Sequence, residues 1–402
     1  MRLFKLVDTH HHQHHHHQHH HQNRVNHLHT IFYEQLRHTG LALDYSIFGN
    51  FIVWLMFDKS NVSLYTKILD PSLANNVGQE STRTVLSMTY DCMTYDRDIA
   101  LAVDWIHYLL YIPVCNETNR NFGLMAVRLL APVAMVQIYN SDKPVPRISD
   151  IRVDPQVSLV FWTEFSYNSI QMTPRVMRST QDGHHIRVIA EDRDAIAKSL
   201  TLDIHNRRVC WLTSYRESRQ LSVAMLVCVG YDGTGKQVYT HLNSYFKNIN
   251  PNINILNGNI YWISDLGKSI SMIPISSSNE HFPSIIMDSN YNIGINQFRI
   301  VDRSLQSLGK DHCTDHNCSH MCVPTPDNTM GYRCMCPTGR VVWNGSQCLD
   351  KIELTNKIIM FNYTTNMITN KSSHLWHNYN KHIILLSLLS VLIQLSLHDI
   401  TV

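Results

Sequence analysis

A repeated segment with a period near 50 residues limits the folds open to this chain more than any other feature. Its copies share an apolar-x-apolar-acid pattern, followed by an aromatic-type pair such as Phe161-Trp162. The pattern ends at an Asp in four copies and at an Asn in a fifth: Asp44, Asp104, Asp154, Asp203 and Asn254. The pair begins nine positions after Asp44 and seven positions after the other Asp residues. Self-similarity of this kind indicates stacked units of one architecture.

Each unit reads as about four short strands, because runs of β-branched and aromatic residues are separated by turn residues. Examples of these turns are Asp182-Gly183 and Asp232-Gly233, and no unit holds a convincing 12-residue helical pattern. Four strands per unit at this period are typical of β-propeller blades. His184 and His185 follow the first of these turns, so we expect both side chains at an exposed rim. The sequence therefore predicts an all-β propeller.

We expect the repeated residues to hold neighbouring blades together. The Asp side chains can accept hydrogen bonds from the strand backbone across each blade contact, while the aromatic pairs pack between blades. The predicted inter-blade residues are Asp44, Asp104, Asp154, Asp203, Trp54, Trp162, Trp211 and Trp262.

Six of the ten Cys lie in the 36 residues from Cys313 to Cys348. This density predicts a small module stapled by disulfides in an oxidising compartment. Six Cys allow fifteen connectivities, and spacing alone does not choose among them. A zinc site is the competing interpretation, because His312, His316 and His320 interleave with the thiols, but it leaves Cys348 unexplained. The approach to Cys313 also lacks the acidic cluster that favours calcium.

Two sets of residues resemble a known family. Phe161-Trp-Thr-Glu164 and Tyr261-Trp-Ile-Ser264 resemble the YWTD repeats of low-density lipoprotein receptor-related proteins, and the Cys spacing resembles an EGF-like module. The resemblance implies a six-bladed propeller followed by that module. It also implies three disulfides in the module: Cys313–Cys322, Cys318–Cys334 and Cys336–Cys348. The motif is eroded at Tyr111-Ile-Pro-Val114 and at Cys210-Trp-Leu-Thr213.

The family pattern implies that the two ends of the propeller region share one closing blade. Leu3–Asp8 resembles the third strand of that blade and Gln297–Val301 its first, while the strand expected between them is absent. The expected domains are a propeller over 1–310 with a His/Gln-rich insertion at 10–22, an EGF-like module over 311–350, a disordered polar linker over 351–382, and a short hydrophobic segment over 383–397.

The four remaining Cys lie in the propeller. Cys210 and Cys228 fall on consecutive predicted strands, roughly opposite each other. A cross-strand disulfide and a pair of packed free thiols both fit this placement. Cys92 and Cys115 flank one strand and cannot be paired from the sequence.

The chain ends bear on localisation. Residues 1–7 lack the apolar run of a signal peptide, whereas six sequons favour secretion: Asn61, Asn116, Asn317, Asn344, Asn362 and Asn370. Segment 383–397 is short for a bilayer span; with Ser372 and Ser373 before it, it resembles a GPI-attachment signal. An end that is not genuine is the third interpretation. The His/Gln run is either a metal-binding tract or a low-complexity loop.

These features favour an extracellular binding function. A net charge of +2 gives no electrostatic case for nucleic-acid binding. Gly230–Lys236 nearly matches a phosphate-binding loop, but Gln237 replaces the required Ser or Thr. We therefore expect no enzyme, catalytic residue, metal site or cofactor. The resemblance implies the ligand-binding part of a cell-surface receptor for extracellular proteins or neighbouring receptor modules, in endocytosis or signalling. The alternatives are a secreted or GPI-anchored scaffold without endocytic activity and, third, a propeller enzyme.

Overall fold

The computed structural model describes residues 2–7, 27–33, 41–58, 61–68, 83–89, 100–115, 122–130, 132–140, 147–168, 171–191, 195–215, 223–246, 250–264, 268–276, 282–288 and 297–371. The chain divides into two compact units. The first comprises Met1–Asn317 and Met321–Arg333, and the second comprises Cys318–His320 and Cys334–Val402.

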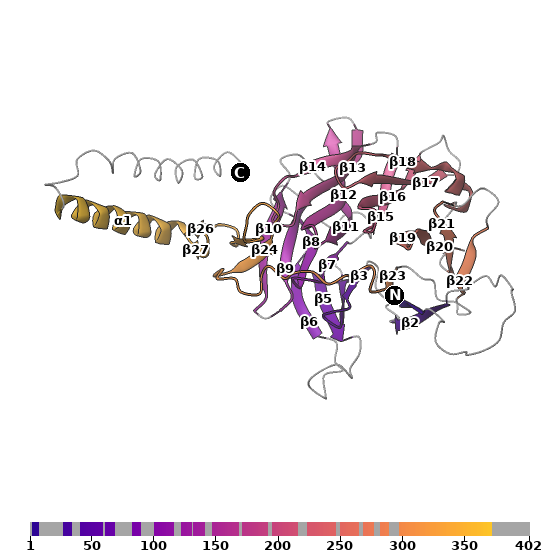
Figure 1. Cartoon of the computed structure of the whole chain (residues 1–402), viewed down its shortest axis with the longest axis horizontal. Helices are drawn as coiled ribbons and strands as arrows, with labels where there is room; N and C mark the ends of the chain where they lie inside the picture. Colours follow the sequence, from indigo (N-terminus) through magenta and orange to yellow (C-terminus); the bar gives the residue numbers. More distant parts are fainter. Residues whose placement is uncertain are drawn as a thin grey trace. The chain divides into compact units, whose positions relative to one another are not determined.

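Five four-stranded antiparallel sheets, each made of consecutive strands, are the blades of a β-propeller in the first unit (Figure 1). Blade 1 contains β3 (Leu41–Ser46), β4 (Phe51–Asp58), β5 (Asn61–Ile68) and β6 (Arg83–Thr89). Blade 2 contains β7 (Ala102–Asp104), β8 (Leu109–Cys115), β9 (Phe122–Arg128) and β10 (Ala134–Asn140). Blade 3 contains β11 (Arg147–Asp154), β12 (Leu159–Asn168), β13 (Gln171–Thr180) and β14 (Arg187–Glu191).

The remaining two blades repeat this arrangement. Blade 4 contains β15 (Ala195–Asp203), β16 (Arg208–Tyr215), β17 (Val223–Gly230) and β18 (Gln237–Tyr239), followed by the 3-10 helix η2 (Thr240–Phe246). Blade 5 contains β19 (Asn250–Leu256), β20 (Asn259–Ser264), β21 (Ser269–Pro274) and β22 (Ser284–Asp288). The first strand of each blade contacts the first strand of the next, so these strands line the propeller axis.

A three-stranded sheet joins the two ends of the propeller region. Its order is β2 (His27–Tyr33), β1 (Arg2–Val7) and β23 (Phe298–Val301). The β1–β23 pair is parallel, whereas every blade is antiparallel. In an antiparallel sheet the first and third strands run in the same direction, so a parallel pair is what remains when the second strand is missing. β23 contacts β19 on one side and β3 on the other.

The aromatic residues of the repeat pack between sheets. Trp162 has no exposed surface, and its ring centroid lies 4.9 Å from that of Tyr139 in blade 2. Trp211 packs in one buried cluster with Phe161 of blade 3, and Trp262 in another with Cys210 of blade 4. Trp54 shares a cluster with a residue of β23, Val301. Each aromatic side chain therefore lies against the preceding sheet.

The second unit contains a helix where we expected a disordered linker. Its elements include β26 (Val341–Trp343), β27 (Gln347–Leu349) and α1 (Lys351–Lys371). The Asp350 carboxylate accepts a hydrogen bond from the Glu353 N–H (2.8 Å), and the Glu353 carboxylate accepts one from the Asp350 N–H (3.0 Å). This capping box starts the helix, and its spacing is visible in the sequence. The expectation of a disordered 351–382 was therefore wrong over 351–371.

No helix within the described ranges is both long enough and apolar enough to cross a membrane. Segment 383–397 and the His/Gln run at 10–22 lie outside the described residues.

Disulfides join directly opposed or neighbouring Cys in both units. Cys210 on β16 faces Cys228 on β17 and is bonded to it, so of the two alternatives the structure holds the cross-strand disulfide. The other three bonds are Cys313–Cys322, Cys318–Cys334 and Cys336–Cys348. Cys115 is disulfide-bonded, while Cys92 lies outside the described residues.

Removing the Cys210–Cys228 bond should destabilise the propeller. A cross-link closing a loop of this size stabilises a protein by about 2–4 kcal/mol, so the Cys210→Ala/Cys228→Ala variant should unfold at lower urea. Denaturant unfolding followed by Trp fluorescence measures the change. The control is Cys336→Ala/Cys348→Ala, which leaves the propeller bond intact. Equal loss in both variants, or alkylation of Cys210 before reduction, would contradict the assignment.

Candidate functional site

Polar side chains on the inner strands bind the next blade. The Asp44 carboxylate accepts a hydrogen bond from the Val103 N–H (2.9 Å), and the Asp150 carboxylate accepts one from the Leu200 N–H (2.7 Å). Later blades use neutral acceptors at the equivalent contact. They are the hydroxyl of Ser199 for the Ile253 N–H (3.2 Å) and the amide oxygen of Asn252 for the Phe298 N–H (3.3 Å).

Of the four predicted inter-blade Asp residues, Asp44 accepts a backbone N–H of the next blade as expected, whereas the other three cap turns of their own blades, which corrects the expected partner. Asp104 accepts hydrogen bonds from the backbone N–H groups two and three residues on, at 2.8 and 2.9 Å. Asp154 and Asp203 cap the corresponding turns of blades 3 and 4. In blade 1 this position is Ser46, not Asp44. The nine-residue offset at Asp44 was the sequence signal that it is not equivalent.

Two of these capping residues also reach the next blade, through side chains instead of the backbone. Asp104 accepts a hydrogen bond from the Gln181 amide (2.7 Å), and Asp154 accepts one from the Tyr231 hydroxyl (3.0 Å). Ile275 occupies the equivalent position in blade 5 and has no side-chain donor. Asp203 instead pairs with Arg208 of its own blade at 2.6 Å.

Four charged residues meet near the axis. Arg152 lies 2.5 Å from Asp150, and Arg299 of β23 lies 3.9 Å from Asp44. Burial first, and then repulsion by Arg152, lower the pKa of Arg299 to about 10. Burial raises the pKa of Asp44, although the Arg299 charge opposes that rise. The two cations and two anions neutralise each other within the buried interior.

Replacing Asp150 with Ala should cost far more stability than replacing Ser199. Both side chains accept an equivalent inner-strand N–H, but the loss of Asp150 also leaves the Arg152 charge unpaired. We expect about 3–5 kcal/mol for Asp150→Ala and about 1 kcal/mol for Ser199→Ala. Urea unfolding of both variants measures the difference. Equal effects would show that the charge pair contributes nothing beyond the hydrogen bond.

The segment that follows β23 crosses the face formed by the first turn of each blade. The Gln306 side-chain amide donates to the Tyr45 carbonyl (2.8 Å) and its oxygen accepts from the Ile47 N–H (2.7 Å). The next residue, Ser307, accepts a hydrogen bond from the Trp105 indole N–H (3.0 Å) through its carbonyl. This segment is therefore tied to blades 1 and 2. We call this surface the first-turn face.

A cavity of about 390 Å³ opens on the first-turn face beside this segment. Blades 2, 3 and 4 and residues 309–312 contribute its lining: Ile106, Asp154, Pro155, Gln156, Val157, Ser158, Ile204, Arg207, Gly309, Lys310 and His312. Burial raises the pKa of Asp154, and its hydrogen bond from Tyr231 opposes that rise. The volume lies within the usual range of ligand-binding pockets.

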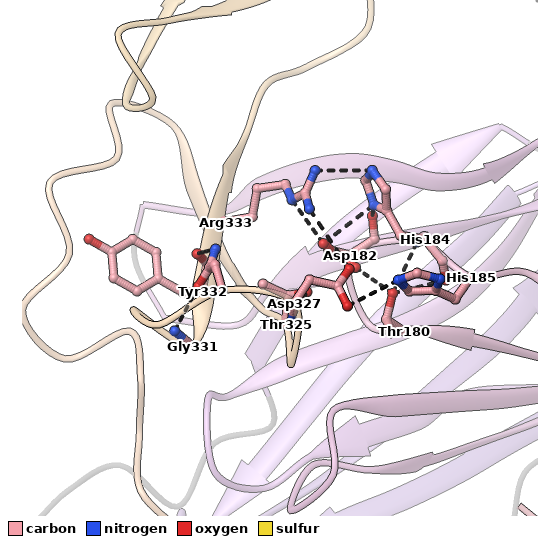
Figure 2. A network of polar contacts seen from close by, with 10 residues as sticks. Thr180, Asp182, His184, His185, Thr325, Asp327, Gly331, Tyr332 and Arg333 are labelled. Atoms are coloured by element: carbon pink, nitrogen blue, oxygen red, sulfur yellow. Dashed lines mark hydrogen bonds and ion pairs between the residues drawn. The ribbon is translucent and has the colours of Figure 1, made fainter.

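A hairpin over 321–333 contacts the turn between β13 and β14 (Figure 2). It carries β24 (Met321–Pro324) and the start of β25 (Tyr332–Met335). Asp182 has no exposed side-chain surface; its carboxylate lies 2.9 Å from the Arg333 guanidinium and accepts a hydrogen bond from the Thr180 hydroxyl (2.5 Å). Arg333 therefore holds the hairpin to a buried anion.

Two half-exposed His residues complete the network in Figure 2. His185 lies 3.0 Å from the Asp327 carboxylate, and His184 lies 3.0 Å from the Arg333 guanidinium. Their side chains are 57% and 48% exposed, respectively. Both His residues thus face the hairpin of their own chain. Gly183 (φ +80°) is required between them and Asp182, because a Cβ there would collide with the Ile138 carbonyl.

Neutralising Asp182 should loosen this hairpin. Asp182→Asn preserves the shape but removes the charge opposite Arg333, which is 40% exposed, so we expect a loss of about 1–3 kcal/mol in hairpin docking. Hydrogen exchange at the Thr325 and Gly331 N–H groups should accelerate. His185→Gln is the control, because an exposed pair contributes under about 1 kcal/mol. Unchanged exchange in Asp182→Asn would remove Arg333 as the anchor.

Most of the sequon Asn residues lie in the part of the chain that the structure describes. Asn317, Asn344 and Asn362 are exposed, Asn61 begins β5 and Asn370 lies in α1. Asn116 lies outside the described residues.

Within the ranges that the structure describes, no three His, Cys, Asp or Glu side chains gather as a metal site would require.

The relatives of this chain are receptors. It is 26% identical over 240 residues to the vitellogenin receptor Yl of Drosophila melanogaster, and 26% identical over 261 residues to the vitellogenin receptor of Solenopsis invicta. The chain is a relative of the low-density lipoprotein receptor family. The resemblance drawn from the YWTD motifs is thereby confirmed. The matches cover 60% and 63% of this chain but only 11% and 13% of the two receptors.

No protein-family model matches the chain. A chain from a crystal structure of a nidogen–laminin complex is 14% identical, with a TM-score of 0.42 over 59% of this chain and 76% of that chain. TolB from Acinetobacter baumannii is 9% identical, with a TM-score of 0.42 over 62% and 54%.

Proposed function

We propose that this chain is an extracellular ligand-binding segment of a receptor of the low-density lipoprotein receptor family. The observation that carries the proposal is the relation to vitellogenin receptors over 60% of the chain. Polar inner-strand residues and buried aromatic side chains, which hold the blades together, support a rigid binding platform. A receptor segment of this kind works at the cell surface or outside the cell. Its role in endocytosis or signalling follows from the same relation.

The propeller has six blades in this proposal, with β23, β1 and β2 as the closing blade. The contacts of β23 with both β19 and β3 support this, because they complete a ring of inner strands. The hydrogen bond from the Phe298 N–H to Asn252 supports it as well, because it repeats the contact between earlier blades. The parallel β1–β23 pair is the result expected when a closing blade has three strands.

The Cys-rich region over 311–350 is an EGF-like module in this proposal. Its three disulfides join the pairs that the family resemblance implies. The exposed Asn317 and Asn344 are its candidate glycosylation sites, and Asn362 and Asn370 are two more in the following helix α1. Oxidised Cys and glycans both belong to an extracellular setting.

The partners are extracellular proteins, and the segment acts by binding, without a cofactor and without catalysis. The relatives are receptors, and each is named for a vitellogenin. A vitellogenin is therefore the first ligand to test.

Purified glycosylated chain should bind a vitellogenin in biolayer interferometry. The reduced and alkylated chain is the control, because it keeps the composition but loses the disulfides. Binding by the oxidised chain only is the expected result. No binding at vitellogenin concentrations up to about 10 μM, a weak affinity for a specific complex, would overturn the assignment of this ligand.

A further inference from the structure

The first turns of blades 1 to 4 share an unusual backbone conformation. Each places one residue in the left-handed region, at φ between 50° and 55°. These residues are Asn50, Tyr108, Ser158 and Arg207. Asn adopts this region with little cost, whereas a long side chain such as that of Arg gains no local compensation. Arg207, like Tyr108 and Ser158, therefore departs from what stability favours at this position.

Arg207 also lines the cavity on the first-turn face. Its guanidinium makes no hydrogen bond or ion pair with the described residues, although its charge acts on the nearby Asp154 carboxylate. The ammonium of Lys310, which also lines the cavity, likewise makes no hydrogen bond or ion pair with the described residues. The two cations come from different segments, blade 4 and the crossing segment after β23. Both side chains are exposed, so their charges are available to a ligand at the cavity.

The other lining residues indicate which kind of ligand the cavity could bind. Ile106, Val157 and Ile204 supply apolar wall surface. The Asp154 carboxylate already accepts hydrogen bonds from the Gln156 N–H (3.1 Å) and the Tyr231 hydroxyl (3.0 Å). Arg207 and Lys310 outnumber this one carboxylate in the lining, so the cavity carries a net positive charge next to apolar walls that a side chain could fill.

We propose that this cavity binds a short acidic segment of a protein partner, with Arg207 and Lys310 pairing with its carboxylates. The apolar walls favour a peptide over a sulfated sugar. A site for a sulfated sugar would present a longer row of cations and no apolar surface. The inference rests on the proposed function in that the partner is a protein, and it adds where and by what chemistry that partner is held.

The test uses the full chain and two capped tetrapeptides, Leu-Glu-Asp-Leu and its neutral counterpart Leu-Gln-Asn-Leu, in ligand-observed NMR titrations. The acidic peptide should bind about tenfold more tightly than the neutral one, and added salt should weaken it. Arg207→Asn and Lys310→Gln should each weaken it about fivefold. Arg303→Asn is the matched control: Arg303 is an exposed cation of the same segment outside the cavity, and its loss should change nothing.

Stability separates binding from folding in this experiment. Arg207→Asn should leave the thermal midpoint unchanged or raise it, because Asn suits the left-handed conformation. In the Arg207→Glu/Lys310→Glu variant, the preference should reverse toward a Leu-Lys-Lys-Leu peptide.

Several results would overturn the inference: no preference for the acidic peptide, equal weakening by Arg303→Asn, or binding of a heparin hexasaccharide in place of the peptide. Vitellogenin binding that survives Arg207→Asn and Lys310→Gln would overturn the cavity as the site of that ligand while leaving the proposed function standing.

Discussion

The hydrogen bonds from inner-strand side chains to the next blade are the interaction on which the propeller depends. The first strand of each blade is a sheet edge, so half of its backbone N–H groups have no partner within the blade. Asp44, Asp150, Ser199 and Asn252 accept these groups from one blade to the next. A strand edge that could otherwise pair with another protein chain is therefore hydrogen-bonded to the neighbouring blade.

The same joint explains where charge is tolerated in the interior. Asp150 lies 2.5 Å from Arg152, and Asp44 is matched by Arg299. Blades 4 and 5 use Ser199 and Asn252, whose side chains carry no charge. Charge and countercharge thus occur together, as the cost of burying an ion requires.

The first turns show how a repeat leaves room for function. In blades 1 to 4, capping by Ser46, Asp104, Asp154 or Asp203 gives the first turn the same backbone, with one left-handed residue. The frame is constant, so the side chain at that residue is free to vary. Arg207 lies at such a position beside the cavity, while the buried Asp182 holds the hairpin of residues 321–333 on a different turn.

The sequence by itself determined the repeat, the strand-rich units, the aromatic residues between sheets and the density of Cys, because periodicity and composition are local properties. It also placed Leu3–Asp8 and Gln297–Val301 in one sheet, through the spacing of the family motif. Only the tertiary structure decided that Asp150, and not Asp154, meets the next inner strand, because hydrogen-bond partners depend on strand register across blades. The cavity and the Asp182–Arg333 pair were likewise decided there, since their residues come from segments far apart in the chain and meet only when the fold brings them together.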